Sequence, residues 1–246
     1  MKQKIYFVSG GPGDPGLLTI RGKEILEKSD IVIYFKPYET LHEKYLKNKE
    51  IYEAFSLKFE EIVSLIEKAS YSQKIVSFLV PGDIAIFSPF SVFLAYFKNN
   101  VEIIPGVGTL NYFSAKLNYI LNSHSQVYKI VIISTKILNE RVGNISLKNY
   151  TDKNTVLIIF MNDMSIKKIV EELKDIYDND AMIHIGVKLS MSDEKIYSFP
   201  LQNFSNNLEI DEKLSIIIVT PFNEMPLKKK WWNKKVEEYK SKKINL

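Results

Sequence analysis

Two kinds of hydrophobic pattern alternate along this chain. Short apolar runs rich in β-branched residues are typical of strands, and segments with an apolar residue every three or four positions are typical of helices. The runs predict strands at 4–8, 30–35, 75–79, 102–104, 128–134, 155–161, 182–188 and 214–220. The periodic segments predict helices near 19–28, 57–69, 89–98, 107–122 and 165–177. Strands that alternate with helices in this way indicate an α/β fold.

The alternation is broken near 105–112, where the sequence reads Pro105-Gly106-Val107-Gly108. A chain of 246 residues is long enough for two α/β units of about half that length. We therefore expect an N-terminal α/β lobe at 1–106 and a C-terminal α/β lobe at 107–226, with a cleft between them.

The segment 227–246 has a different composition from the rest of the chain. It places eight lysines around Trp231 and Trp232. One interpretation is a partly helical, solvated tail whose tryptophans pack back on the body. The alternative is a surface for an acidic partner or an anionic membrane.

Composition and charge narrow the classes of function. The net charge is +4, and no basic stretch is interleaved with aromatic residues as in a nucleic-acid groove, so we expect no nucleic-acid partner. The chain has no cysteine, which excludes disulfides and thiolate catalysis. His42, His124 and His184 lack the spacing of metal ligands, so we expect no metal site. No signal-peptide core or membrane span is present, and we expect a cytoplasmic protein.

The loop at 9–19 follows the first apolar run and leads into a predicted helix. Three of its glycines match G-x-G-x-x-G, the dinucleotide-binding fingerprint. However, Pro12 and Pro15 have no N–H for a pyrophosphate, and Asp14 puts a carboxylate where the phosphates would lie. The acidic residue that would bind a ribose after the second strand is also missing. A nicotinamide or flavin enzyme is therefore the less favoured interpretation.

Several motifs occur in a characteristic order along the chain. They are the loop at 9–19, its continuation to Gly22, and the segments 29–34, 80–87, 101–107 and 157–161. In this order and at these separations they resemble the tetrapyrrole methylases, the S-adenosylmethionine-dependent C-methyltransferases of cobalamin and sirohaem synthesis. The resemblance covers roughly residues 3–220. Within the family, 55–63 and 192–196 are most similar to the branch that methylates precorrin-4 or cobalt-precorrin-4 at C11.

Three positions depart from the family pattern. Ser9 replaces the first glycine of the first loop, Ile84 replaces the proline after Gly82-Asp83, and Gly108-Thr109-Leu110 replaces the small residues after the P-G-V motif. The turns remain plausible, but the substrate is left open. The alternatives are another branch (precorrin-2 C20 or uroporphyrinogen III methylation), a ribose-methylating RNA methyltransferase of the same fold, and a scaffold that only binds the methyl donor.

The resemblance implies a homodimer that holds S-adenosyl-L-methionine in the cleft, largely through backbone groups, and acts on a tetrapyrrole. Its donor-binding positions correspond here to Pro12 as a wall, to Pro81, Gly82, Asp83 and Ile86 beside the methionine part, and to Gly108, Thr109, Met161 and Leu189 around the adenosine. Asp14 is the candidate catalytic group facing the substrate, and the alternative is that it caps a helix. Lysines or Arg21 at the rim are expected to bind the substrate's carboxylates.

The chemistry suits these residue types. Glycines let a ligand approach the backbone closely. Transfer of a methyl group from a sulfonium needs alignment of the nucleophile more than acid–base groups. The absence of cysteine and the scarcity of histidine are therefore compatible with this function.

Overall fold

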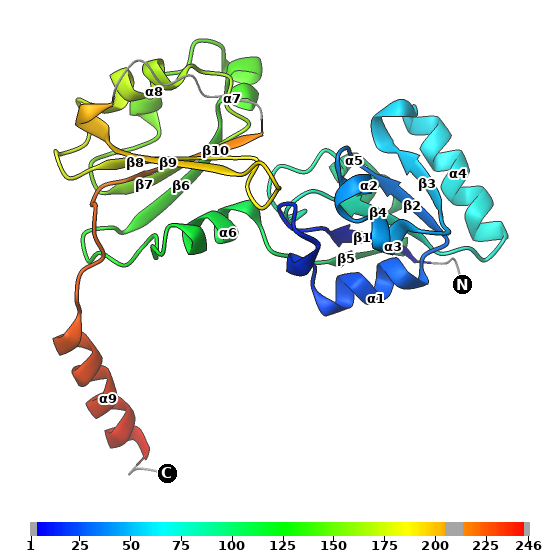
Figure 1. The fold of residues 1–246 in the computed structure, drawn as a ribbon, viewed down its shortest axis with the longest axis horizontal. Helices are drawn as coiled ribbons and strands as arrows, with labels where there is room; N and C mark the ends of the chain where they lie inside the picture. Colours follow the sequence, from blue (N-terminus) through cyan, green and yellow to red (C-terminus); the bar gives the residue numbers. More distant parts are fainter. Residues whose placement is uncertain (1–3, 205–213, 244–246) are drawn as a thin grey trace. The chain divides into compact units, whose positions relative to one another are not determined.

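The computed structural model describes residues 4–204 and 214–243. Its strands form two five-stranded sheets, each accompanied by helices (Figure 1). The chain divides into two compact units. The first contains the described residues up to Leu117, together with Ile185–Tyr197 and the start of the last strand, and the second contains the other described residues.

The first sheet has the strand order β3-β2-β4-β1-β5. Its strands are β1 (Ile5–Ser9), β2 (Ile31–Tyr34), β3 (Glu50–Glu53), β4 (Val76–Val80) and β5 (Val101–Ile104). They pair in parallel, with Ile5 opposite both Val76 and Val101. Nearly every residue of the three central strands is buried, as expected for parallel strands covered on both faces. The carboxyl ends of β4, β1 and β5 consequently lie next to one another.

Helices cover the two faces of this sheet and form a separate core on each. They are α1 (Ile20–Lys28), α2 (Tyr38–Leu41), α3 (Glu43–Leu46), α4 (Phe59–Tyr71) and α5 (Ser91–Phe97). A further helix, α6 (Thr109–Lys116), follows β5. Phe7 of β1 packs in the core formed with α4 and α5, and its ring stacks on Phe78 at 4.4 Å. The next residue, Val8, packs in the core formed with α1, α2 and α3. Successive side chains of a strand point to opposite faces, which explains this division.

The second sheet has the order β6-β7-β10-β8-β9. Its strands are β6 (Lys129–Ser134), β7 (Thr155–Phe160), β8 (Met182–Val187), β9 (Lys195–Pro200) and β10 (Ser215–Thr220). The later helices are α7 (Thr135–Val142), α8 (Ile166–Leu173) and α9 (Lys229–Lys243). The Ser165 side chain caps α8 by accepting the Lys168 N–H at 3.2 Å, and the apolar face of α8 is buried.

All eight predicted strands are present, and the α/β fold class is confirmed. The sequence pattern missed β3 and β9, which lie at the edges of their sheets, and the helices α2, α3 and α7. The predicted helix at 107–122 ends earlier, at Lys116, and Asn118 just beyond it has a positive φ of 50°. The lobe boundaries at 1–106, 107–226 and 227–246 remain a prediction.

A buried histidine lies within the second sheet. The imidazole of His184 has its Nδ1 2.8 Å from the Ser198 hydroxyl and its Nε2 3.4 Å from the Thr220 hydroxyl. Burial lowers the pKa of His184 to about 4. The neutral ring is therefore part of the hydrogen bonding that joins β8 to β9 and β10.

We expect His184 to make stability depend on pH between about 6.5 and about 4. Above that window His184 makes its full contribution to the free energy of unfolding. This contribution is lost as the pH falls, because the histidine of the unfolded chain takes up a proton at a higher pH than the buried one. The loss amounts to at most roughly 3 kcal/mol. Urea unfolding at several pH values, compared with His184→Gln, measures it. Parallel pH profiles for the two proteins would contradict the prediction.

Candidate functional site

Two glycine loops meet at the carboxyl edge of the first sheet. Gly11 follows β1 and Gly82 follows β4, and the two form an isolated antiparallel bridge. The Gly11 N–H donates to the Gly82 carbonyl at 3.2 Å, and the Gly82 N–H donates to the Gly11 carbonyl at 2.8 Å. Their φ angles are +77° and +65°, a region that glycine adopts without strain. Glycine at both positions therefore allows the loops to pair.

Asp83 connects the second loop to a third, which follows β5. Its Oδ1 accepts the Ala85 N–H at 2.9 Å, and its Oδ2 accepts the Gly106 N–H at 2.9 Å. Beyond Gly106 the chain enters α6, where the Thr109 hydroxyl lies 3.3 Å from the place a Cβ on Gly82 would occupy. One carboxylate thus fixes the separation of two loops.

Ser9, which departs from the family pattern, has a structural role in the same cluster. It is fully buried, and its hydroxyl accepts the Ile84 N–H at 3.1 Å. A Cβ added to Gly106 would lie 2.6 Å from the Cβ of Ser9 and 2.8 Å from its carbonyl oxygen. The serine therefore holds the second loop and requires glycine in the third.

Two buried side chains from α2 and its C-terminal end support the glycine bridge. The Tyr38 hydroxyl donates to the Gly11 carbonyl at 2.6 Å and accepts the Gly82 N–H at 3.3 Å. The His42 ring stacks on Tyr38, and its Nε2 donates to the Gly10 carbonyl at 3.0 Å. Burial raises the pKa of Tyr38 and lowers the pKa of His42, so both are neutral near pH 7. The sequence analysis assigned no role to either residue.

The segment after β8 packs against the first loop and α6, and it belongs to the first unit. The Ser190 hydroxyl accepts the Asp14 N–H at 2.6 Å. Glu194 accepts the Ser190 N–H at 2.6 Å and the Tyr112 hydroxyl at 2.7 Å, and it pairs with Lys116 at 2.9 Å. Burial raises the pKa of Glu194, but these three donors outweigh burial and the net pKa is lowered. Glu194 therefore holds this segment in place as a carboxylate.

The structure places most of the predicted site residues within the first unit. These are Pro12, Asp14, Pro81, Gly82, Asp83, Ile86, Gly108, Thr109 and Leu189. Met161 follows β7 in the second unit, where it has a positive φ of 43° and is 39% exposed. Their functional roles remain predictions.

Asp14 has a capping role in the structure. Its Oδ1 accepts the Gly16 N–H at 2.7 Å, at the start of the 3₁₀ turn Pro15–Leu17. The next helix, α1, is capped instead by Thr19, whose hydroxyl accepts the Gly22 N–H at 3.1 Å. Asp14 is exposed at the surface. Arg21, the predicted rim cation, pairs with Glu102 at 3.3 Å.

The loop cluster is suited to a ligand held by the backbone. Side chains are absent at Gly11, Gly82 and Gly108, and Asp83 fixes the loops from within. Ile86 and Phe87, which follow in the second loop, add exposed apolar surface. No cluster of metal-ligating side chains was found in 4–204 or 214–243.

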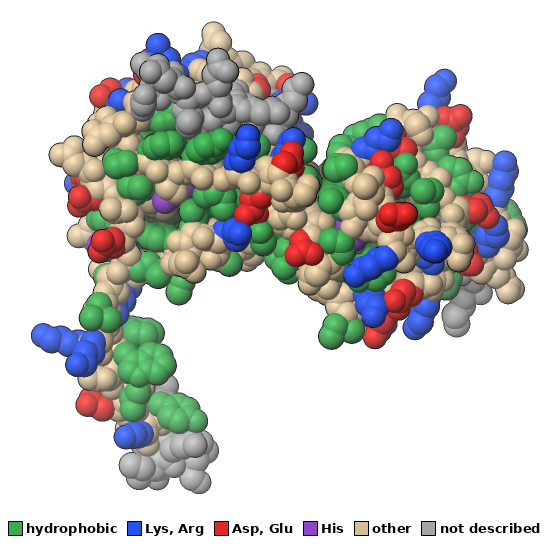
Figure 2. Space-filling model, viewed as in Figure 1, with side chains coloured by type: hydrophobic (Ala, Val, Ile, Leu, Met, Phe, Trp, Pro, Cys, Tyr) green, Lys and Arg blue, Asp and Glu red, His purple; other side chains and the backbone are tan. Residues whose placement is uncertain are grey.

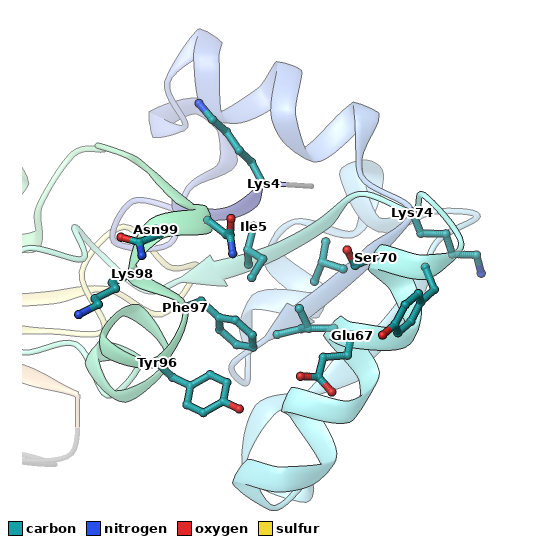
Figure 3. Close-up of a pocket in the computed structure, with 13 residues that line it drawn as sticks. Lys4, Ile5, Glu67, Ser70, Lys74, Tyr96, Phe97, Lys98 and Asn99 are labelled. Carbon is teal, nitrogen blue, oxygen red and sulfur yellow. The ribbon is translucent and has the colours of Figure 1, made fainter. Parts of the chain in front are cut away.

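A cavity of about 430 Å³ lies at the opposite, amino-terminal edge of the first sheet (Figure 3). Its lining includes Ile5 and Val76, which begin β1 and β4, and Phe97 at the end of α5. None of the predicted site residues lines it. The glycine loops and this cavity are therefore separated by the length of the strands.

Comparison with known sequences assigns the chain to a family. The model for Tetrapyrrole (Corrin/Porphyrin) Methylases matches residues 4–205. The chain belongs to the tetrapyrrole methylases. A cobalt-precorrin-4 C(11)-methyltransferase of Methanocaldococcus jannaschii is 30% identical over 225 residues, or 88% of this chain and 87% of that protein. A uroporphyrinogen-III C-methyltransferase of Cyanidium caldarium is 27% identical over 184 residues, or 69% of this chain and 72% of that protein.

Solved structures of tetrapyrrole methylases share the fold. A cobalt precorrin-4 methyltransferase has a TM-score of 0.73 at 20% identity, covering 88% of this chain and 94% of that chain. A uroporphyrin-III C-methyltransferase from Thermus thermophilus, complexed with S-adenyl homocysteine, has a TM-score of 0.66 at 21% identity, covering 88% of this chain and 97% of that chain. Membership of the family confirms the predicted methyltransferase activity and S-adenosylmethionine as methyl donor.

We expect Tyr38→Phe to weaken donor binding several-fold, because the Gly11 carbonyl and the Gly82 N–H lose a shared partner. The loss of a buried hydroxyl also destabilises the fold by about 1–3 kcal/mol. Calorimetric titration with S-adenosylmethionine measures the first effect, and urea unfolding measures the second.

Tyr177→Phe is the matched control. The buried Tyr177 hydroxyl donates to the Thr155 carbonyl at 2.8 Å in the second unit. This variant should lose comparable stability and keep its donor affinity. Equal donor affinities for the two variants would show that Tyr38 has no role in holding the loops.

Proposed function

We propose that this protein is an S-adenosylmethionine-dependent C-methyltransferase that methylates precorrin-4 or cobalt-precorrin-4 at C11, in cobalamin biosynthesis. The observation that carries this assignment is the 30% identity, over nearly its whole length, with a relative named for that reaction. Relatives from Priestia megaterium and Rhodococcus erythropolis carry cobalt-precorrin-4 and precorrin-4 C(11)-methyltransferase names, at 22% and 23% identity. Uroporphyrinogen III is the second candidate substrate, because relatives named for its methylation also match.

The glycine loops of the first unit provide the donor site in this proposal. The methyl donor supplies a methyl group already activated on a sulfonium. Backbone groups near Gly82 and Gly108 contact it, while Pro12, Pro81, Ile86, Thr109 and Leu189 supply the walls. Asp83 acts indirectly, because both of its oxygens already accept backbone N–H groups and set the loop spacing.

The reaction requires alignment more than proton transfer by the protein. An electron-rich pyrrolic carbon attacks a methyl group best when it lies in line with the bond that breaks. Tyr38 and His42 are buried beneath the loops and neutral, so their role is to hold backbone. Asp14 is the exposed carboxylate of the first loop, and we assign it a catalytic role facing the substrate.

Binding of the substrate's carboxylates is assigned to basic residues at the rim. Arg21 is exposed and shares its guanidinium with Glu102 and Glu24. A substrate carboxylate can exchange with these surface pairs at low cost, because exposed ion pairs contribute about 0–1 kcal/mol. We also propose that the protein is a homodimer and that it is located in the cytoplasm.

We expect Asp83→Ala to lower donor affinity at least tenfold, by about 1.4 kcal/mol or more, because the second and third loops lose their link. Calorimetric titration with S-adenosylmethionine measures this loss. The control is Asp152→Ala in the second unit, where Asp152 accepts the Asn154 N–H at 2.9 Å and pairs with Lys129 at 2.6 Å. Both variants should remain folded, and unchanged affinity in Asp83→Ala would remove Asp83 from the donor site.

Incubation with methyl-labelled S-adenosylmethionine and a panel of precorrin-4, cobalt-precorrin-4 and uroporphyrinogen III tests the reaction itself. Mass spectrometry and NMR should locate the label at C11 of one of the first two. Asp14→Asn should transfer the label more slowly with near-normal donor affinity. Label on another carbon would contradict the C11 assignment, and full turnover by Asp14→Asn would leave Asp14 as a cap alone.

A further inference from the structure

The C-terminal helix α9 carries the positive charge of this protein. Of the 33 basic and 29 acidic residues in the chain, eight basic and two acidic residues fall in 227–246. This segment therefore has a net charge of +6, and the remaining 226 residues have a net charge of −2. Such a local excess is an electrostatic signature of binding to a polyanion.

Three apolar side chains of α9 lie along one face, and Trp231 lies off that face. Trp232, Val236 and Tyr239 are spaced four and three residues apart, so they share one face. Trp232 is 64% exposed and Tyr239 is 63% exposed. Figure 2 shows apolar side chains gathered along this helix beside basic ones. We call these three residues the aromatic stripe.

Lysines flank the aromatic stripe, and acids lie away from it. At 3.6 residues per turn, Lys229 and Lys240 border the stripe on one side and Lys235 borders it on the other. The two acidic residues, Glu237 and Glu238, fall well outside the stripe and its borders. Between Lys229 and Lys240 the helix therefore presents an apolar strip bordered by lysines.

We propose that α9 binds the surface of an anionic phospholipid bilayer, lying along it with the aromatic stripe in the headgroup region. Tryptophan and tyrosine favour that depth, because one end of each ring is apolar and the other is polar. The bordering lysines can reach lipid phosphates while their stems cover apolar surface. Leu227, 93% exposed just before the helix, adds apolar surface at its start.

The same features favour a bilayer over other polyanions. A nucleic acid or an acidic protein would attract every lysine of the helix, including Lys230 and Lys234 on the face opposite the stripe. A bilayer combines negative charge with an apolar phase that takes up Val236 and the two rings together. In the described residues no helix is long and apolar enough to cross a membrane, so binding is at the surface.

Tryptophan fluorescence of the full chain provides a direct test, because Trp231 and Trp232 are its only tryptophans. Vesicles of phosphatidylcholine with about one third phosphatidylglycerol should shift the emission to the blue and carry the protein into the pellet on centrifugation. Vesicles of phosphatidylcholine alone should do neither. Raising the salt concentration should weaken binding, because salt screens charges beyond about one Debye length.

Two charge-reversal pairs distinguish the proposed face from charge in general. Lys229→Glu with Lys240→Glu reverses lysines that border the stripe, and Lys230→Glu with Lys234→Glu makes the same change in charge on the opposite face. The first pair should weaken vesicle binding more than about tenfold, and the second only a few-fold. Trp232→Ala should abolish most of the blue shift. Circular dichroism checks that each variant stays folded.

Three outcomes would overturn the proposal. The first is no binding to anionic vesicles. The second is an equal loss of vesicle affinity in both charge-reversal pairs. The third is binding to polyuridylate that is tighter than binding to vesicles and that causes no blue shift. Each variant should methylate a soluble tetrapyrrole at the wild-type rate. Vesicle binding and methyl transfer are measured separately. A failure of vesicle binding with intact methyl transfer contradicts only this proposal, and a failure of methyl transfer with intact vesicle binding contradicts only the proposed function.

Discussion

The candidate site depends on a pair of backbone hydrogen bonds between Gly11 and Gly82. Gly11 and Gly82 lie just beyond the ends of the buried parallel strands β1 and β4, so the strands bring the loops together. The Tyr38 hydroxyl hydrogen-bonds to both glycines of the bridge. The Asp83 carboxylate joins the loop after β4 to the loop after β5. The cluster is therefore held by polar contacts within the loops and by a rigid sheet beneath them.

This arrangement builds the bridge itself from two glycines, which carry no side chains. Glycine at positions 11 and 82 lets the two loops pair, and both residues are buried. The polar side chains that fix the geometry are directed to neighbouring backbone or are buried. A substitution that spares the glycine bridge and the contacts of Asp83 therefore leaves these loop connections in place.

The sequence predicted the buried parts of the fold better than the edges. Central strands are near-continuous apolar runs, which makes them visible, whereas β3 reads Glu-Ile-Tyr-Glu and β9 begins with lysine. Motif order identified the family and the glycine loops. It gave no role to Tyr38, His42 or Ser190, because their contacts join residues 27 to 176 positions apart. Only the folded chain shows that Asp83 and Glu194 organise loops.

The contact between Ser9 and Gly106 has a consequence for how this sequence can change over time. With serine at position 9, even a methyl group at position 106 collides with its Cβ and carbonyl. Replacing Ser9 by glycine would relieve only the Cβ collision and leave the carbonyl in place. Any larger residue at position 106 therefore requires the main chain of the first strand to move. A single substitution at this position cannot evolve without that movement.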